Sequence, residues 1–239
     1  MTVARLGVNI DHIATLREAR KTKEPLPLAG ALICEKAGAD SIVAHLREDR
    51  RHIKEKDLFL LRRKIRTRLN LEMSTARDVV SVACKVKPDR ATLVPEKRKE
   101  LTTEGGLDVV SNSARIKEVF RKLDKNGIEV SLFIDPDKRQ IDRAAILGIS
   151  FIELHTGRYA NAQSSQEQKK FLVQIRQAAE YARQKGIRVS AGHGLDYRNI
   201  AAISKLKMLG EFNIGYSIIC YALFVGLEQA VRKMKLLVR

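Results

Sequence analysis

The stretch Lys185-Gly-Ile-Arg-Val-Ser-Ala-Gly-His-Gly194 contains the unit that repeats along this chain. Gly186 can adopt the left-handed conformation that ends a helix. An apolar run follows it at once and leads into Gly192, His193 and Gly194. A helix, a glycine, a short apolar strand and a polar strand end are typical of an αβ unit in a parallel sheet.

The same unit recurs on both sides of this stretch. Gly38, Gly127 and Gly148 also separate a helical pattern from a short apolar run. Because the first run is not followed by the GxGxxG motif of a doubly wound sheet, the pattern favours a (β/α)₈ barrel, with residues 1–239 as one domain. A last amphipathic helix is predicted over Ser217–Val238. Eight strands are predicted, centred near residues 7, 43, 70, 92, 132, 153, 190 and 213.

Length and composition agree with a barrel of this kind. The 239 residues are close to what one barrel needs, and no uncharged apolar run approaches a membrane span. The N-terminus leads directly into a predicted strand without a signal peptide, so we expect a cytoplasmic protein that does not bind a membrane. The three cysteines lie far apart and form no CxxC pair, which predicts buried free thiols: Cys34, Cys84 and Cys220.

The net charge of +17 predicts attraction to anions. Much of the excess lies in Arg62–Arg68, which we expect on an outer helix as a solvated face. Only 5% of the residues are aromatic and Trp is absent, so no platform for stacking nucleic-acid bases is evident. We therefore expect phosphorylated small molecules rather than nucleic acid as partners.

Two sets of residues are suited to phosphate. Gly192-His193-Gly194 and Asn213–Ser217 follow the seventh and eighth strands, where barrels commonly bind phosphate at a helix N-terminus. Simple turn glycines are the alternative interpretation. The second set consists of cations that follow the first two strands: Arg17, Arg20, Arg47, Arg50, Arg51 and His52.

His45, Glu72 and His193 stand at the ends of the second, third and seventh predicted strands. Histidine titrates near neutral pH, and a carboxyl group in a barrel mouth tends to have its pKa raised, so the three groups suit acid/base catalysis. Two histidines and a carboxylate can also bind a divalent metal, and residue type alone does not decide between these possibilities.

With these residues in place, the chain resembles the pyridoxine 5′-phosphate synthase family of the deoxyxylulose-dependent vitamin B6 route. The resemblance runs from about residue 5 to residue 237 and rests on long, unusual motifs. These are Gly7-Val-Asn-Ile-Asp-His-Ile-Ala-Thr-Leu-Arg-Glu-Ala-Arg20, His45-Leu-Arg-Glu-Asp-Arg-Arg-His52, Asn70-Leu-Glu-Met73, Leu93-Val-Pro-Glu-Lys-Arg98, Glu100-Leu-Thr-Thr-Glu-Gly-Gly-Leu-Asp108, Glu153-Leu-His-Thr-Gly157 and Ala191-Gly-His-Gly194.

The resemblance implies a barrel with additional helices, assembled as an octamer, that needs no metal or organic cofactor. It implies condensation of 3-amino-2-oxopropyl phosphate with 1-deoxy-D-xylulose 5-phosphate to give pyridoxine 5′-phosphate, phosphate and water. His45 and Glu72 would accept protons and His193 would donate one. Asn9, Gly194, Gly215 and the amide of Tyr216 would hold the aminoketone phosphate, and Asp11, His12, Arg20, Arg47, His52 and Thr102 the pentulose phosphate.

One position departs from the family pattern, because the usual Asn-Ile-Gly-His reads Asn213-Ile-Gly-Tyr216 here. If this position acts through its backbone N–H, tyrosine leaves the activity unchanged. If the imidazole of the usual histidine also contacts the phosphate or moves a proton, the aminoketone phosphate binds less well here. Two other functions remain open: a metal-dependent phosphosugar epimerase or aldolase with its ion at His45, Glu72 and His193, and an RNA-binding protein that uses Arg62–Arg68.

Overall fold

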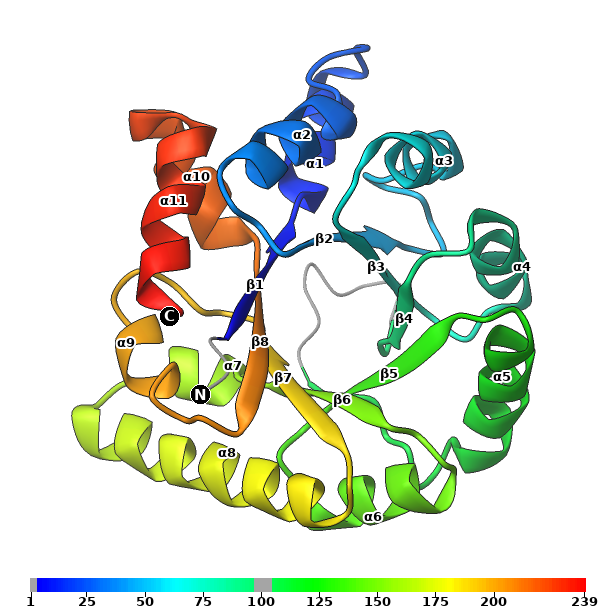
Figure 1. Ribbon diagram of the computed structural model, residues 1–239, viewed down its shortest axis with the longest axis vertical. Helices are drawn as coiled ribbons and strands as arrows, with labels where there is room; N and C mark the ends of the chain where they lie inside the picture. Colours follow the sequence, from blue (N-terminus) through cyan, green and yellow to red (C-terminus); the bar gives the residue numbers. More distant parts are fainter. Residues whose placement is uncertain (1–3, 97–104) are drawn as a thin grey trace.

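The computed structural model describes residues 4–96 and 105–239. Its centre is a closed barrel of parallel strands, each paired with the next in chain order, and β1 pairs with β8 to close the ring (Figure 1). This confirms the predicted (β/α)₈ barrel. The strands are β1 (Arg5–Asn9), β2 (Ser41–Leu46), β3 (Arg68–Met73), β4 (Arg90–Leu93), β5 (Glu129–Ile134), β6 (Phe151–His155), β7 (Arg188–Gly192) and β8 (Leu209–Ile214).

Helices cover the outside of the barrel (Figure 1). The segments after β1, β6 and β8 each carry two helices, which are the additional helices that the resemblance implied. The helices are α1 (Asp11–Arg20), α2 (Pro27–Lys36), α3 (Glu55–Lys64), α4 (Arg77–Val86), α5 (Ser113–Lys125), α6 (Lys138–Ile146), α7 (Gly157–Ala160), α8 (Ser165–Gln184), α9 (Ile200–Ile203), α10 (Tyr216–Val225) and α11 (Leu227–Leu237).

The glycines predicted to end helices adopt the left-handed conformation. Gly38, Gly127, Gly148 and Gly186 have φ angles of 98°, 73°, 81° and 76°. Residues with a Cβ rarely adopt these angles, so the glycines allow the chain to leave each helix and enter the next strand directly.

The C-terminal segment differs from the single helix predicted over Ser217–Val238. α10 ends at Val225 and α11 begins at Leu227, with Gly226 between them at a φ of 84°. This angle lies outside the helical region, so the chain changes direction there. The helical spacing of apolar residues continues across Gly226, which is why the periodicity alone predicted one helix.

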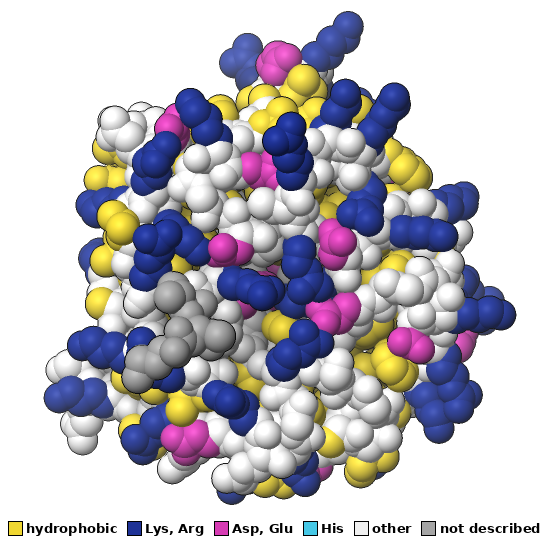
Figure 2. All heavy atoms as spheres, in the orientation of Figure 1, with side chains coloured by type: hydrophobic (Ala, Val, Ile, Leu, Met, Phe, Trp, Pro, Cys, Tyr) yellow, Lys and Arg dark blue, Asp and Glu magenta, His cyan; other side chains and the backbone are white. Residues whose placement is uncertain are grey.

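The basic run Arg62–Arg68 lies only partly on a helix, because α3 ends at Lys64 and β3 begins at Arg68. Arg62 pairs with Asp89 at 3.2 Å, and Arg68 pairs with Glu129 at 2.9 Å. The prediction that the whole run lies on an outer helix is therefore wrong. Figure 2 shows Lys and Arg side chains spread over the visible face with Asp and Glu among them, rather than gathered into one stripe.

The interior of the barrel and the helix faces that pack against it form one core. Cys34 lies in this core, and burial raises the pKa of its thiol to about 12. Cys84 and Cys220 are free thiols but only half-buried, so the prediction of buried thiols is correct for Cys34 alone. Within residues 4–96 and 105–239, every helix is too short or too polar to cross a membrane.

Candidate active site

The carboxyl ends of β1, β2 and β3 bring three predicted site residues together. Asp11 follows β1, and His45 of β2 lies opposite Glu72 of β3 in the strand register. Side-chain ligand atoms of the three residues lie within 4.8 Å of one another. Asp11 Oδ1 accepts a hydrogen bond from the backbone N–H of His45 at 2.8 Å, which fixes the carboxylate beside that strand.

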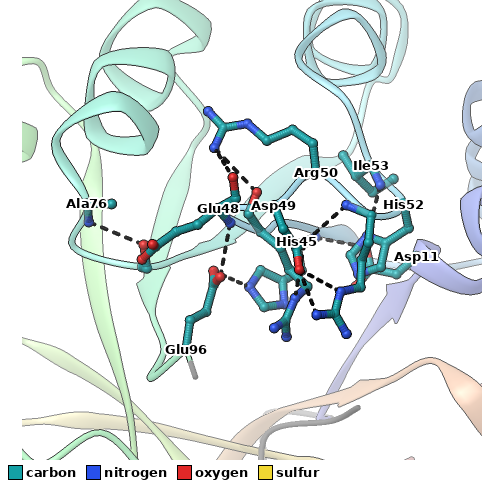
Figure 3. A network of polar contacts seen from close by, with 12 residues as sticks. Asp11, His45, Glu48, Asp49, Arg50, His52, Ile53, Ala76 and Glu96 are labelled. Atoms are coloured by element: carbon teal, nitrogen blue, oxygen red, sulfur yellow. Dashed lines mark hydrogen bonds and ion pairs between the residues drawn. The ribbon is translucent and has the colours of Figure 1, made fainter. Parts of the chain in front are cut away.

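Glu96, which follows β4, orients the His45 ring (Figure 3). Its Oε1 lies 2.9 Å from His45 Nε2, and its Oε2 accepts the backbone N–H of Glu48 at 3.0 Å. In the neutral imidazole this pairing places the hydrogen on Nε2, because a carboxylate can only accept, and leaves a lone pair on Nδ1. Glu96 was not predicted as a site residue, and its only signal in the sequence was its place after a strand.

The predicted cations after β1 and β2 lie in different surroundings. Arg47 is 5% exposed and pairs with Asp49 at 3.7 Å, and the ring of His52 lies 6.0 Å from that of His45. Arg17 instead forms a buried bidentate ion pair with Asp57, at 2.7 and 2.8 Å, so the prediction that Arg17 binds phosphate is wrong. Two further cations are paired with carboxylates: Arg50 with Glu55 and Asp78, and Arg51 with Asp49.

A cavity of about 850 Å³ joins this group to the residues that follow β7 and β8. Glu72 lines it from β3, Asn9 and His12 from the end of β1, and His193 and Gly194 from the loop after β7. Its volume is in the range of small-molecule sites. With Gly215 and Tyr216 after β8, seven predicted site residues therefore face one cavity although they come from four different strand ends.

The loops after β7 and β8 form the part of this cavity that is suited to an anion. Ser217 Oγ donates a hydrogen bond to the carbonyl oxygen of Leu195 at 2.7 Å, which ties the two loops together. α10 begins at Tyr216, and the first N–H groups of a helix have no partner within it. These N–H groups and the helix dipole favour a phosphate here.

Gly215 is required by the close approach of the end of β8 to the end of β1. A Cβ at this position would lie 2.7 Å from Asn9 Cβ and 2.9 Å from the Asn9 carbonyl oxygen. The Asn9 side chain in turn donates from Nδ2 to Asp11 Oδ2 at 2.9 Å. A short series of contacts thus connects the anion-binding loops to the carboxylate of Asp11.

Tyr216, the departure from the family pattern, is 68% exposed. Its ring meets that of His12 edge-on, with the ring centres 5.2 Å apart. Burial lowers the pKa of His12, so this imidazole is neutral at neutral pH. The side chain at residue 216 therefore touches a predicted substrate-binding residue, in addition to the backbone contribution of the helix start.

The titratable groups of the cavity have shifted pKa values. Burial, together with the charges of Glu153 and Asp11, raises the pKa of Glu72 well above its usual range. Burial raises the pKa of Glu153 to about 7, although Asn213 Nδ2 donates to Glu153 Oε2 at 2.5 Å. Burial, and then His155, lower the pKa of His193 to about 4.

Glu153 was not predicted as a site residue. It is 2% exposed and lies inside the barrel, on the cavity. Its signal in the sequence was a carboxylate within the otherwise apolar run Phe151–Leu154.

Two predicted residues, Arg20 and Thr102, are not placed near the other site residues by the described part of the chain. Arg20 is the exposed last residue of α1, and a ten-residue helix places it about 15 Å from the end of β1. Thr102 lies outside the described residues. The roles of both residues remain predictions.

The metal alternative named His45, Glu72 and His193. Among the residues with described positions, the group that could hold an ion consists of Asp11, His45 and Glu72 instead. His193 follows β7, which lies across the barrel from β2 and β3. Both oxygens of Asp11 already accept hydrogen bonds from Asn9 and His45, and an ion would have to compete with these.

Solved structures of low sequence identity share this fold. One is the 4-hydroxy-2-oxoglutarate aldolase/2-deydro-3-deoxyphosphogluconate aldolase from TTHB1, at 16% identity and a TM-score of 0.64, covering 99% of this chain and 96% of that one. Another is the phosphoribosylanthranilate isomerase from Thermotoga maritima, at 13% identity and a TM-score of 0.62, covering 98% of both chains. At these identities the likeness establishes the barrel fold alone.

Sequence relatives are much closer. The pyridoxine 5′-phosphate synthase of Synechococcus sp. (strain JA-2-3B'a(2-13)) is 54% identical over 230 residues, 96% of each chain. That of Sulfurihydrogenibium sp. (strain YO3AOP1) is 54% identical over 234 residues, 97% of this chain and 96% of the relative. The sequence profile of the family described as pyridoxal phosphate biosynthesis protein PdxJ matches residues 6–239. The resemblance found in the motifs is thereby confirmed, and the chain belongs to this family.

Proposed function

We propose that this chain is a pyridoxine 5′-phosphate synthase, which condenses 3-amino-2-oxopropyl phosphate with 1-deoxy-D-xylulose 5-phosphate. One observation carries the proposal beyond family membership. A single cavity joins a carboxyl group of raised pKa, Glu72, to an anion-binding corner at the start of α10. The reaction needs both, because it moves protons at carbon and nitrogen on substrates that carry phosphate.

Glu72 and His45 are the proposed proton acceptors. The raised pKa of Glu72 makes its carboxylate a stronger base than an exposed glutamate, so it can remove a proton near neutral pH. His45 is held at Nε2 by Glu96, which leaves Nδ1 to accept a proton. Formation of a Schiff base between the amine and the pentulose ketone, and loss of phosphate, both require such bases.

His193 is the proposed proton donor. Its lowered pKa makes it neutral in the free enzyme at neutral pH. A phosphate dianion that binds beside it favours the imidazolium form and so raises its pKa. The imidazolium form is thereby favoured when substrate is present, and it can protonate an oxygen that leaves as water.

The two phosphates occupy opposite sides of the cavity in this proposal. The aminoketone phosphate lies at the glycine loops, where backbone N–H groups replace its water shell. The pentulose phosphate lies beside the cations that follow β1 and β2. The proposed contacts are Asn9, Gly194, Gly215 and Tyr216 for the first, and Asp11, His12, Arg20, Arg47, His52 and Thr102 for the second.

We also propose that the protein assembles into a homo-oligomer, an octamer by the family resemblance. Leu223, Phe224 and Leu236 on α10 and α11 are 71%, 85% and 68% exposed. The two helices pack against each other, and exposed apolar side chains favour a contact with another protein chain. Light scattering after size-exclusion chromatography measures the number of chains directly.

Incubation of the purified protein with both substrates tests the proposed activity. Pyridoxine 5′-phosphate and inorganic phosphate should appear in equal amounts, and omission of either substrate should abolish both. The proposed reaction uses no metal or organic cofactor, so a chelator should leave the rate unchanged. Activity lost with chelator and restored by one divalent ion per chain would favour a metal-dependent enzyme instead.

A further inference from the structure

β5, β6 and β7 are neighbours in the barrel (Figure 1). At their ends Asp135 contacts His155, and His155 and Thr156 contact the loop that carries His193. His155 and Thr156 belong to the motif Glu153–Gly157, yet the proposed chemistry assigns them no role. They are 6% and 0% exposed, so they do not bind solvent at the surface.

The backbone of His193 has a conformation that non-glycine residues seldom adopt. Its φ angle is 80°, and Gly194 follows with a φ of 78°. Such a conformation is strained and persists only where its surroundings hold it. The structure around His193 therefore supplies contacts that select this conformation.

Thr156 supplies these contacts. Its Oγ1 lies 2.8 Å from the carbonyl oxygen of Gly192 and 2.6 Å from that of His193, and it donates its hydrogen to this pair of oxygens. Its backbone N–H donates to the Gly192 carbonyl at 2.9 Å. Both peptide groups that flank the His193 side chain are thus bound to one buried residue.

His155 contacts the side chain of His193 itself. The two rings meet edge-on, with their centres 5.0 Å apart, and Phe133 packs against both. The other edge of His155 is fixed, because its Nδ1 lies 2.9 Å from Asp135 Oδ1. Within the described chain, its Nε2 is buried without a hydrogen-bond partner.

Gly157 leaves room for this approach of the two rings. A Cβ on Gly157 would lie 2.5 Å from His155 Nε2 and 3.4 Å from His193 Cδ2. The glycine therefore faces both imidazoles, and its lack of a side chain keeps the space between them open.

We propose that His155 and Thr156 are positioning residues for His193: Thr156 holds its backbone in the left-handed conformation, and His155, fixed by Asp135, holds its ring. The proposal rests on the proposed function for the proton-transfer role of His193. The charged groups that face this assembly are Asp135 and, beyond it, Arg158, which acts on the Asp135 carboxylate. His155 is the titratable group that acts on His193.

Thr156→Val tests the backbone contact, with Thr156→Ser as its matched control. Valine has nearly the shape of threonine but no hydroxyl, whereas serine keeps the donor. We expect Thr156→Val to lower kcat by roughly 10- to 100-fold, the cost of a displacement of up to about 1 Å, with little change in KM. Thr156→Ser should restore most of kcat. Equal kcat values in the two variants, when both are folded by circular dichroism, would overturn the role of Thr156.

His155→Phe tests the ring contact by a measurement that needs no activity. The chain has five histidines, so the imidazole nitrogens of each can be assigned and followed by NMR as the pH changes. Phenylalanine keeps an aromatic ring against Phe133 but removes both nitrogens. We expect the His193 titration midpoint to rise by more than about half a pH unit, because a neighbour that disfavours its imidazolium is gone.

Asp135→Asn is the second variant, since Asp135 is half-exposed and its replacement should not prevent folding. It frees the His155 ring without removing it, so it should move the His193 midpoint by less than His155→Phe does. An unchanged His193 titration in both variants would overturn the role of His155. If the wild-type protein forms no pyridoxine 5′-phosphate, the proposed function fails, whereas the NMR titration still decides whether His155 positions His193.

Discussion

The two ends of this barrel hold their ionisable residues in opposite ways. At the amino ends of the strands, Glu129 accepts hydrogen bonds from Arg68 and Arg90 at 2.9 and 2.8 Å, and Arg188 is a third partner. Burial would raise the pKa of Glu129, but these guanidinium groups hold it below its usual range. The charges of this cluster compensate one another.

At the carboxyl ends of the same strands the balance is reversed. Glu72 and Glu153 lie close enough for the charge of Glu153 to raise the pKa of Glu72, and burial raises both values. Buried carboxyl groups without a guanidinium partner reduce stability, but their raised pKa values suit proton transfer near neutral pH. The difference teaches that one end of the barrel serves stability and the other serves chemistry, as the fold generally divides these tasks.

Glu72→Gln should give the largest effect on activity. The amide keeps the shape of the side chain but cannot accept a proton, so we expect turnover to fall by about 10²–10⁴ with the fold intact. Phosphate release measured directly gives the rate. The matched control is the same change at the other end of the barrel, Glu129→Gln, which should keep the turnover of folded molecules. Turnover of Glu72→Gln within a few-fold of wild type would remove this residue from the mechanism.

Arg90→Met should give the largest effect on stability. Arg90 is 3% exposed, bonds to Glu211 at 2.8 Å, and stacks on Phe151 with its guanidinium carbon 3.6 Å from the ring centre. Its removal leaves the buried carboxylate of Glu211 without this partner, so we expect the free energy of unfolding to fall by about 3–5 kcal/mol.

Urea unfolding at a fixed protein concentration measures this loss. Arg232→Met, which breaks an exposed pair with Glu228, serves as the control and should cost less than about 1 kcal/mol. If Arg90→Met instead lowers turnover of the folded enzyme more than tenfold, the two ends of the barrel are not as separate as proposed.

Glu153→Gln should change how stability depends on pH. Below the usual glutamate pKa both the folded and the unfolded chain keep the Glu153 proton. Between that value and about 7 the unfolded chain loses the proton while the folded chain keeps it, so stability falls as the pH rises. The slope from one such group is at most about 1.4 kcal/mol per pH unit.

Glutamine has no proton to lose, so the variant should gain stability over wild type progressively across this window and no further above it. Unfolding free energies measured at pH values from about 4 to about 8 give the difference between the two proteins. A difference that does not change with pH would show that folding does not raise the pKa of Glu153.

Arg47→Ala should chiefly weaken binding of the pentulose phosphate. Arg47 is buried beside His52, and the loss of a charge-assisted hydrogen bond costs about 1.5–3 kcal/mol, roughly 10- to 100-fold in Kd. Calorimetric titration with each substrate separately measures the effect, with Arg232→Ala on α11 as a control for lost surface charge. An effect confined to the aminoketone phosphate would show that the two phosphate sites are exchanged.

The barrel could be predicted from the sequence because its signals are local. Gly38, Gly127, Gly148 and Gly186 each end a helix within a few residues of the next strand, and the backbone angles at these glycines need no distant contact. The positions of Glu72 and His193 followed in turn, because strand ends converge in a closed barrel.

What the sequence could not predict depends on pairs of residues far apart in the chain. From the sequence, Arg17 is expected to be a cation available to phosphate after the first strand. In the structure it pairs with Asp57, which lies forty residues further along the chain. Glu96 approaches His45 only when β2 and β4 lie in one barrel. Gly226 is a different case, since a single glycine within a regular apolar pattern can either continue a helix or break it.

Tyr216→His should give the smallest effect, although it restores the usual residue of the family. The N–H groups at the start of α10 are present whatever the side chain is, and we expect them to supply most of the attraction for phosphate. The tyrosine ring is 68% exposed and meets His12 edge-on, and an imidazole can make a similar contact. We therefore expect kcat/KM to change by less than about tenfold, which corresponds to less than about 1.4 kcal/mol.

Steady-state kinetics in both substrates measure this change in kcat/KM, with Tyr216→Phe as the control for the hydroxyl group. A hundredfold rise in kcat/KM for the aminoketone phosphate would mean that the imidazole itself binds or protonates the substrate, and that this corner depends on a side chain as much as the Glu72 side of the cavity does.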